Sequence, residues 1–153
     1  MTTSDFKYPV ASVDKYGNVY ISIDENTLTT INNASLKAHN WTDSYIVDCD
    51  GIAAKIEDMR FISGIGSFWG YSIFFDRLIR VEIILGEEFS MSLDEIKKPI
   101  LRYIHGGMSS VVSPSAVLQD MRTIKATKTI DDLFRLALPY MDLQDFWQTF
   151  KKH

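Results

Sequence analysis

The sequence predicts a single α+β domain over residues 1–153, in which an antiparallel sheet from the N-terminal two-thirds packs with C-terminal helices. Residues 1–90 are mainly short apolar strands with one helix, whereas residues 92–153 carry mainly helical patterns. Strands followed by helices, rather than alternating with them, are typical of the α+β class. Short connections favour antiparallel pairing, because parallel strands need crossovers of about a dozen residues or more.

The first predicted element is a β-hairpin. Residues 10–13 and 19–23 are rich in valine and isoleucine, and they flank the turn sequence DKYGN at residues 14–18. The second arm alternates apolar and polar side chains, as a half-buried strand does. A helix is expected next, over residues 26–38, because apolar residues recur there with helical spacing.

A second strand–turn–strand unit is predicted where the apolar residues 45–47 and 52–56 flank an Asp-Gly turn. Further strands are expected at residues 61–62, 71–75 and 79–85. The glycine-rich stretch at residues 64–70 superficially resembles a dinucleotide-binding loop. Because a strand follows it, however, no helix N-terminus is available to hold a phosphate, and we expect a plain loop there.

Helix signals begin after residue 91. Ser92 and Glu95 can form a capping box, in which each side chain bonds to the backbone amide of the other residue. The helix that they open is expected to end at Gly106, since glycine commonly follows the last helical turn. Ser113 followed by Pro114 has the form of an N-cap with proline at the first helical position, and predicts another helix start.

Two more helices are predicted at the C-terminal end of the sequence. Thr129 is a suitable N-cap, and the helix that it opens is expected to end at Pro139, because proline breaks the helical hydrogen-bond pattern. A last amphipathic helix is expected from Asp142. Its apolar stripe is formed by Leu143, Phe146, Trp147 and Phe150.

Composition and charge exclude several classes of protein. No apolar stretch approaches the roughly 18 residues of a membrane span, and the N-terminus lacks the segments of a signal peptide, so we expect a cytoplasmic protein with no membrane partner. Residues 1–96 contain 15 acidic and 7 basic residues, while residues 97–153 contain 5 and 9. An acidic half repels nucleic acid and attracts cationic partners, so nucleic acid is not an expected partner.

The motif that most suggests chemistry is YIVDCDGI at residues 45–52. It resembles the first motif of haloacid-dehalogenase-type phosphatases, and this resemblance implies Asp48 as nucleophile, Asp50 as proton donor and Mg²⁺ held between them. Ile52 stands where that family has threonine or valine, and its downstream lysine and acidic motif find no clear match. We favour a turn between strands. With one cysteine and no histidine pair at ligand spacing, we expect no catalytic residue, no cofactor and no metal site.

The chain resembles small bacterial immunity proteins of polymorphic-toxin or contact-dependent inhibition systems. The resemblance lies in its size, its acidic bias and its predicted order of a hairpin, a helix and the strand–turn–strand unit of residues 45–52. The resemblance implies a non-enzymatic protein that neutralises a cognate toxin by occluding its active or functional surface. Carboxylates and aromatic side chains suit an interface with a basic toxin. The candidate contacts are Asp43, Asp48, Asp50, Glu57, Asp58, Trp69, Glu87 and Glu88. A monomer and a homodimer are both compatible with this interpretation.

Two other functions stay open at this stage. The first is a Mg²⁺-dependent, phosphatase-like hydrolase that uses Asp48 and Asp50. The second is a non-catalytic adaptor domain that self-associates through a strand edge or through the amphipathic C-terminal helix.

Overall fold

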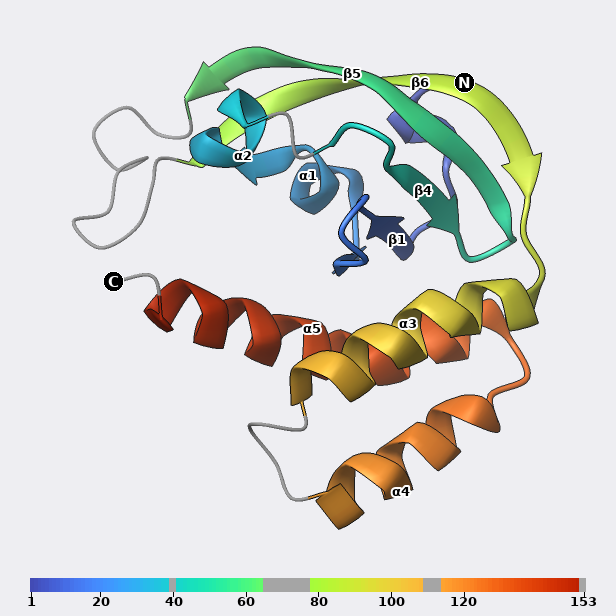
Figure 1. Ribbon diagram of the computed structural model, residues 1–153. Helices are drawn as coiled ribbons and strands as arrows, with labels where there is room; N and C mark the ends of the chain where they lie inside the picture. Colours follow the sequence, from blue (N-terminus) through green and yellow to red (C-terminus); the bar gives the residue numbers. More distant parts are fainter. Residues whose placement is uncertain (39–40, 65–77, 109–113, 152–153) are drawn as a thin grey trace.

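The computed structural model describes the backbone of residues 1–38, 41–64, 78–108 and 114–151 (Figure 1). The described strands form one curled antiparallel sheet in the order β2-β1-β4-β5-β6-β3. These strands are β1 (Val10–Val13), β2 (Val19–Ser22), β3 (Thr30–Asn32), β4 (Tyr45–Asp48), β5 (Ile52–Gly64) and β6 (Leu78–Ser90). The N-terminal part of the chain therefore builds the sheet, and the prediction of an α+β fold is confirmed.

Three long helices form a layer on one side of the sheet. They are α3 (Leu93–Met108), α4 (Pro114–Lys125) and α5 (Ile130–Lys151). In Figure 1, α3 and α5 lie next to the sheet and α4 lies outside them. The short helices α1 (Glu25–Leu28) and α2 (Asn33–Lys37) lie on the other side, beneath the arch of β5 and β6, and a 3₁₀ turn (Thr3–Asp5) precedes β1. None of the described helices is long and apolar enough to cross a membrane.

The core has two parts, which lie on opposite faces of the central strands. Ala11 of β1 and Val47 of β4 are buried in the cluster that α3, α4 and α5 complete. Their neighbours Val10 and Ile46 are buried in a second cluster, enclosed by the curled half of the sheet. Because successive side chains of a strand point to opposite faces, β1 and β4 are covered on both sides. This burial makes them the rigid centre from which β5 and β6 extend.

The predicted helix at residues 26–38 is wrong, because the chain forms α1, β3 and α2 there. The carboxylate of Asp24 accepts a hydrogen bond from the Thr27 amide at 2.7 Å and starts α1. The hydroxyl of Thr29 then donates to the Glu25 carbonyl at 2.8 Å, within the last turn of this short helix. Residues 30–32 instead pair with β6, a partner almost fifty residues away that local periodicity does not reveal.

Three of the four helix starts predicted after residue 91 are confirmed, whereas the start predicted at Asp142 is wrong, because that residue lies inside α5. In α3, the Glu95 amide donates to Ser92 Oγ at 3.2 Å and the Ser92 amide donates to Glu95 Oε1 at 3.3 Å, which is the expected capping box. At the start of α5, the hydroxyl oxygen of Thr129 accepts from the Asp132 amide at 3.1 Å. Helix α4 begins at Pro114, as predicted.

Two predicted helix ends are wrong. Helix α3 continues two residues beyond Gly106, and α5 continues through Pro139 as one helix to Lys151. Proline removes one helical hydrogen bond. Ala137 and Met141 on either side of Pro139 are buried in the core, and their packing keeps α5 helical through the proline. The apolar stripe predicted from residue 143 onwards concerns side chains outside the described residues.

The remaining strand predictions merge into longer elements. Residues 61–62 belong to β5 and residues 79–85 to β6, so that each strand is 13 residues long. The expected strand at residues 71–75 and the glycine-rich loop after Gly64 lie outside the described residues. Both predicted turns are present, with Gly17 at a φ of 86° and Gly51 at a φ of 85°.

The two glycines make a matched pair for a stability test. A side chain at Gly17 would meet nothing within 4 Å, whereas a Cβ at Gly51 would lie 2.6 Å from the carbonyl oxygen of Met91. We expect Gly17→Ala to lower the free energy of unfolding by about 1 kcal/mol, the conformational cost of a left-handed alanine. Gly51→Ala should cost about 2–4 kcal/mol, because overpacking against backbone is added. Urea denaturation of both variants measures the difference, and equal losses would contradict the close contact at Gly51.

Candidate partner-binding surface

The candidate surface is the long two-stranded ribbon formed by β5 and β6, which arches over the rest of the sheet (Figure 1). Its pairing brings together acidic residues from two separate stretches of sequence. Asp58 on β5 lies opposite Ile84 on β6, and Glu88 lies opposite Ala54. Glu57, Glu87 and Glu88 are exposed, and Asp58 is half-buried. Four of the eight candidate residues are therefore collected on this ribbon.

Glu57 connects the two strands of the ribbon directly. The pairing register shifts at residue 57, so the ladder is irregular there. A Cβ placed on Gly86 would lie 2.5 Å from Glu57 Oε1 and 2.7 Å from Glu57 Cγ. The Glu57 side chain thus lies across the glycine of the neighbouring strand, and Gly86 leaves the space that the side chain occupies.

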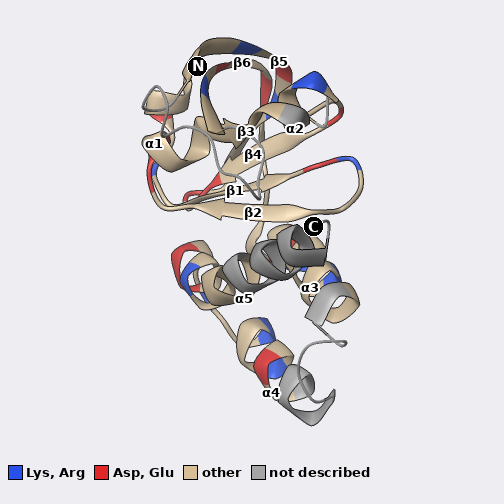
Figure 2. Ribbon diagram, turned by 90° about the vertical axis from the view of Figure 1, so that its left-hand side faces the viewer, with Lys and Arg blue, Asp and Glu red and all other residues tan. Residues whose placement is uncertain are grey.

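The ribbon carries fewer basic than acidic residues. The Asp58 carboxylate pairs with Arg60 Nε at 3.1 Å, and Arg60 lies opposite Glu82. The described residues of β5 and β6 contain five acidic residues and three basic ones, and red segments appear on both strands in Figure 2. We call Glu57, Asp58, Glu82, Glu87 and Glu88 together the acidic ribbon. It presents a net negative potential to solvent.

The acidic ribbon carries charge on both of its faces. Asp58 and Glu82 lie on the face away from the enclosed core, because Val81 and Ile83 on either side of Glu82 are buried. Glu88 lies on the same face as Ala54, whose side chain belongs to the enclosed core. Glu82 is a member that sequence reasoning missed. Glu82 lies between two apolar residues, and this alternation predicts an outward-facing side chain. That other acidic residues lie near it follows only from the pairing register of β5 with β6.

Two further candidates lie in the turns that flank β4. Asp43 is exposed in the turn before β4, and the Ile56 amide donates to the Ser44 carbonyl at 2.9 Å, which brings this turn alongside β5 near Glu57. Asp50 is exposed in the turn between β4 and β5, beyond the end of the ribbon where Ile52 pairs with Ser90, and its carboxylate pairs with Lys7 at 3.4 Å. Trp69 lies outside the described residues. Asp43 therefore extends the acidic ribbon, whereas the charge of Asp50, beyond the end of the ribbon, is paired with that of Lys7.

Asp48 differs from the other candidates because it is buried, with 1% of its surface exposed. One carboxylate oxygen accepts from the Lys7 amide at 3.0 Å. The other accepts from the amides of Asp50 at 2.9 Å and Ile52 at 3.0 Å. The carboxylate holds the N-terminal segment and the β4–β5 turn together. It is not a surface group that a partner could contact.

This geometry favours the turn interpretation of residues 45–52 over the phosphatase interpretation. An aspartate nucleophile must reach its substrate, and the Asp48 oxygens are occupied by backbone amides below the surface. Among the described residues, no group of three or more His, Cys, Asp or Glu side chains is placed to hold a metal ion. Burial, followed by the charges of Asp50 and Asp48, raises the pKa of the Cys49 thiol above its usual value. At neutral pH Cys49 therefore stays protonated, which disfavours a role as nucleophile.

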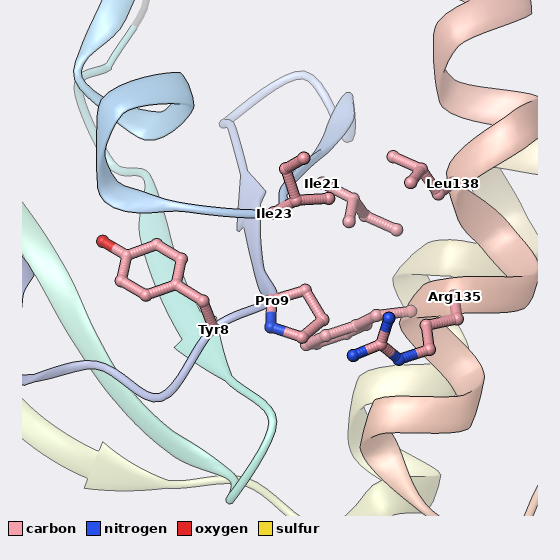
Figure 3. Close-up of a pocket in the computed structure, with 7 residues that line it drawn as sticks. Tyr8, Pro9, Ile21, Ile23, Arg135 and Leu138 are labelled. Atoms are coloured by element: carbon pink, nitrogen blue, oxygen red, sulfur yellow. The ribbon is translucent and has the colours of Figure 1, made fainter.

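A small hollow lies between the end of β2, the segment before β1 and helix α5 (Figure 3). Its lining residues are Tyr8, Pro9, Ile21, Ile23, Phe134, Arg135 and Leu138. The volume of about 90 Å³ is well below the roughly 300–1,000 Å³ of small-molecule sites. The one charged side chain, Arg135, already pairs with Asp131 at 3.0 Å. The hollow is therefore too small to serve as a substrate pocket.

No protein-family model matches the chain, and neither a curated protein nor a solved structure matches it. The fold and the site together define an α+β protein that carries an acidic two-stranded ribbon on its surface.

Proposed function

We propose that the protein is a bacterial immunity protein, which acts in the cytoplasm by binding a basic toxin domain and covering its active or functional surface. The observation that carries the proposal is the pairing of β5 with β6, which gathers the carboxylates of the acidic ribbon on an exposed element. In this proposal the protein has no catalytic activity of its own.

The shape of the acidic ribbon suits a protein partner better than a small molecule. Each strand has 13 residues, which corresponds to a length of about 40 Å. A surface of this length can accommodate a protein interface, which typically buries about 800 Å² on each partner. The face that carries Asp58 and Glu82 points away from the enclosed core and is therefore the face that a partner can cover.

Electrostatics explain why an inhibitor benefits from such a ribbon. Toxin domains that act on nucleic acid need basic active sites, because they bind phosphates. Complementary charge raises the association rate by factors of about 10 to 1,000 at low ionic strength. A protective protein must bind its toxin before damage occurs. Fast, charge-guided association is therefore the property that we expect selection to have favoured.

Protection of cells tests the proposal. Bacteria that express a toxic domain, found by screening the products of the genes that neighbour the gene of this chain, should survive when the intact chain is co-expressed. The double variant Glu87→Lys/Glu88→Lys should lose most of this protection, because it replaces two negative charges of the acidic ribbon by two positive ones. Asp132→Lys, an exposed change in the helix layer, is the control and should protect. If the intact chain gives no protection, or if both variants protect equally, the proposal is wrong.

A further inference from the structure

Two large apolar side chains are exposed at one end of the ribbon, which is its left-hand end in Figure 1. Leu78 begins β6 and is 48% exposed, and Ile62 of β5 is 55% exposed. Ile62 lies at a register shift, directly before the residue that pairs with Arg80. Single exposed apolar residues are ordinary on a protein surface, but here two of them lie close together on the element that carries the acidic residues.

Leu78 lies on the outward face of the ribbon, which is also the face of Glu82. The side chains of Ile79, Val81 and Ile83 are buried in the enclosed core. Because side chains alternate along a strand, residues 78, 80 and 82 of β6 point away from that core. Leu78 is four positions from Glu82, which corresponds to about 13 Å along the strand. The apolar end and the outward carboxylates therefore fit within one protein interface.

We propose that Leu78 and Ile62 are the apolar anchor of the interface with the basic domain. In this proposal the carboxylates set how fast the complex forms, and the apolar pair sets how long it lasts. The inference rests on the proposed function. Protein interfaces combine desolvated apolar side chains with polar ones around them, and a few side chains account for most of the binding free energy. The partner is then expected to carry an apolar patch beside its basic side chains.

Charge favours the basic domain over a second copy of the chain as the occupant of this face. The two cations near the apolar pair are engaged within the chain. Arg60 pairs with the Asp58 carboxylate at 3.1 Å. Arg80 donates to the side-chain oxygen of Asn26. The described residues of the ribbon include five acidic and three basic ones, so a second copy would bring net negative charge against net negative charge.

Leu136 supplies a matched control for Leu78, because it is 42% exposed but lies on α5 in the helix layer. Surface plasmon resonance is measured against the toxic domain that the co-expression experiment identifies. For Ile62→Ala/Leu78→Ala we expect the dissociation rate constant to rise about tenfold, because apolar contacts of the formed complex are lost. The association rate constant should change by less than about twofold. Leu136→Ala should leave both rate constants within about twofold of those of the unmodified chain.

Two further measurements exclude a folding defect as the cause. Leu78→Met keeps the apolar surface, so its dissociation rate constant should stay within about twofold of that of the unmodified chain. Urea denaturation verifies that every variant is folded, as expected for substitutions at exposed positions.

The outcomes separate this inference from the proposed function. If the unmodified chain protects cells but Ile62→Ala/Leu78→Ala dissociates no faster than Leu136→Ala, the inference is wrong and the proposed function stands. If the chain protects against no toxic domain, both are wrong. Light scattering adds a test that needs no partner, and we expect the mass of one chain, 17.5 kDa. A dimer that Ile62→Ala/Leu78→Ala separates would overturn the inference, because a second copy would then occupy this face.

Discussion

Charge reversal on the acidic ribbon is expected to slow the binding of the basic toxin domain that we propose as the partner more than any other surface change. In Glu87→Lys/Glu88→Lys, two exposed carboxylates on adjacent positions of β6 become cations, one on each face of the ribbon. At low ionic strength the association rate constant should fall by roughly tenfold or more, because the steering field is reversed where the partner arrives. Surface plasmon resonance against the immobilised toxin domain measures this rate.

A matched control separates local charge from total charge. Glu88→Lys and Asp132→Lys change the net charge equally, but only Glu88 lies on the acidic ribbon, while Asp132 lies in the first turn of α5. Both residues are exposed, so both variants should fold. We expect Asp132→Lys to alter the association rate constant by less than about twofold. Equal effects of the two variants would mean that the ribbon is not where the partner docks.

Removal of the Asp48 carboxylate is expected to have the largest effect on stability. Asp48→Ala leaves the amides of Lys7, Asp50 and Ile52 without their acceptor in a partly buried environment. Hydrogen bonds to a charged group contribute about 1.5–3 kcal/mol each, and shared contributions reduce the sum. We expect the free energy of unfolding to fall by about 3–5 kcal/mol. Urea denaturation measures this loss. The urea concentration at the midpoint of unfolding should fall, while the dependence of the unfolding free energy on urea concentration stays unchanged.

Two companion variants make the Asp48 prediction specific. Asp48→Asn keeps one oxygen, which can still serve the amides of Asp50 and Ile52, but it loses the acceptor for the Lys7 amide. It should therefore lie between the native chain and Asp48→Ala. Asp50→Ala removes only the exposed pair with Lys7 and should cost less than about 1 kcal/mol. A loss for Asp48→Ala no greater than that for Asp50→Ala would contradict the role assigned to the buried carboxylate.

Sequence reasoning succeeded where a local signal decides the structure. The turn glycines, the capping box of Ser92 with Glu95 and the Thr129 cap are local, and each is present in the structure. It failed where distant packing decides. The pairing of β3 with β6 divides the region predicted as a helix, and burial of Ala137 and Met141 carries α5 past Pro139.

The candidate surface shows the same division between local and distant information. Asp48 and Glu57 have the same chemical character in the sequence, yet one is buried under three amides and the other is exposed across Gly86. The meeting of residues 57–58 with residues 87–88 depends on the β5–β6 register and its shifts. No local pattern encodes that register. Composition could therefore indicate an acidic surface, but could not locate it.

The most direct test of the central claim is the salt dependence of association between the unmodified chain and the toxin domain that the co-expression experiment identifies as its partner. If the acidic ribbon guides binding, the association rate constant should fall steeply as ionic strength rises, because the Debye length shortens from about 30 Å at 0.01 M to about 10 Å at 0.1 M. The Glu87→Lys/Glu88→Lys variant should lack this dependence, and its rate should converge with that of the unmodified chain at high salt. An association rate that does not change with salt would contradict the account.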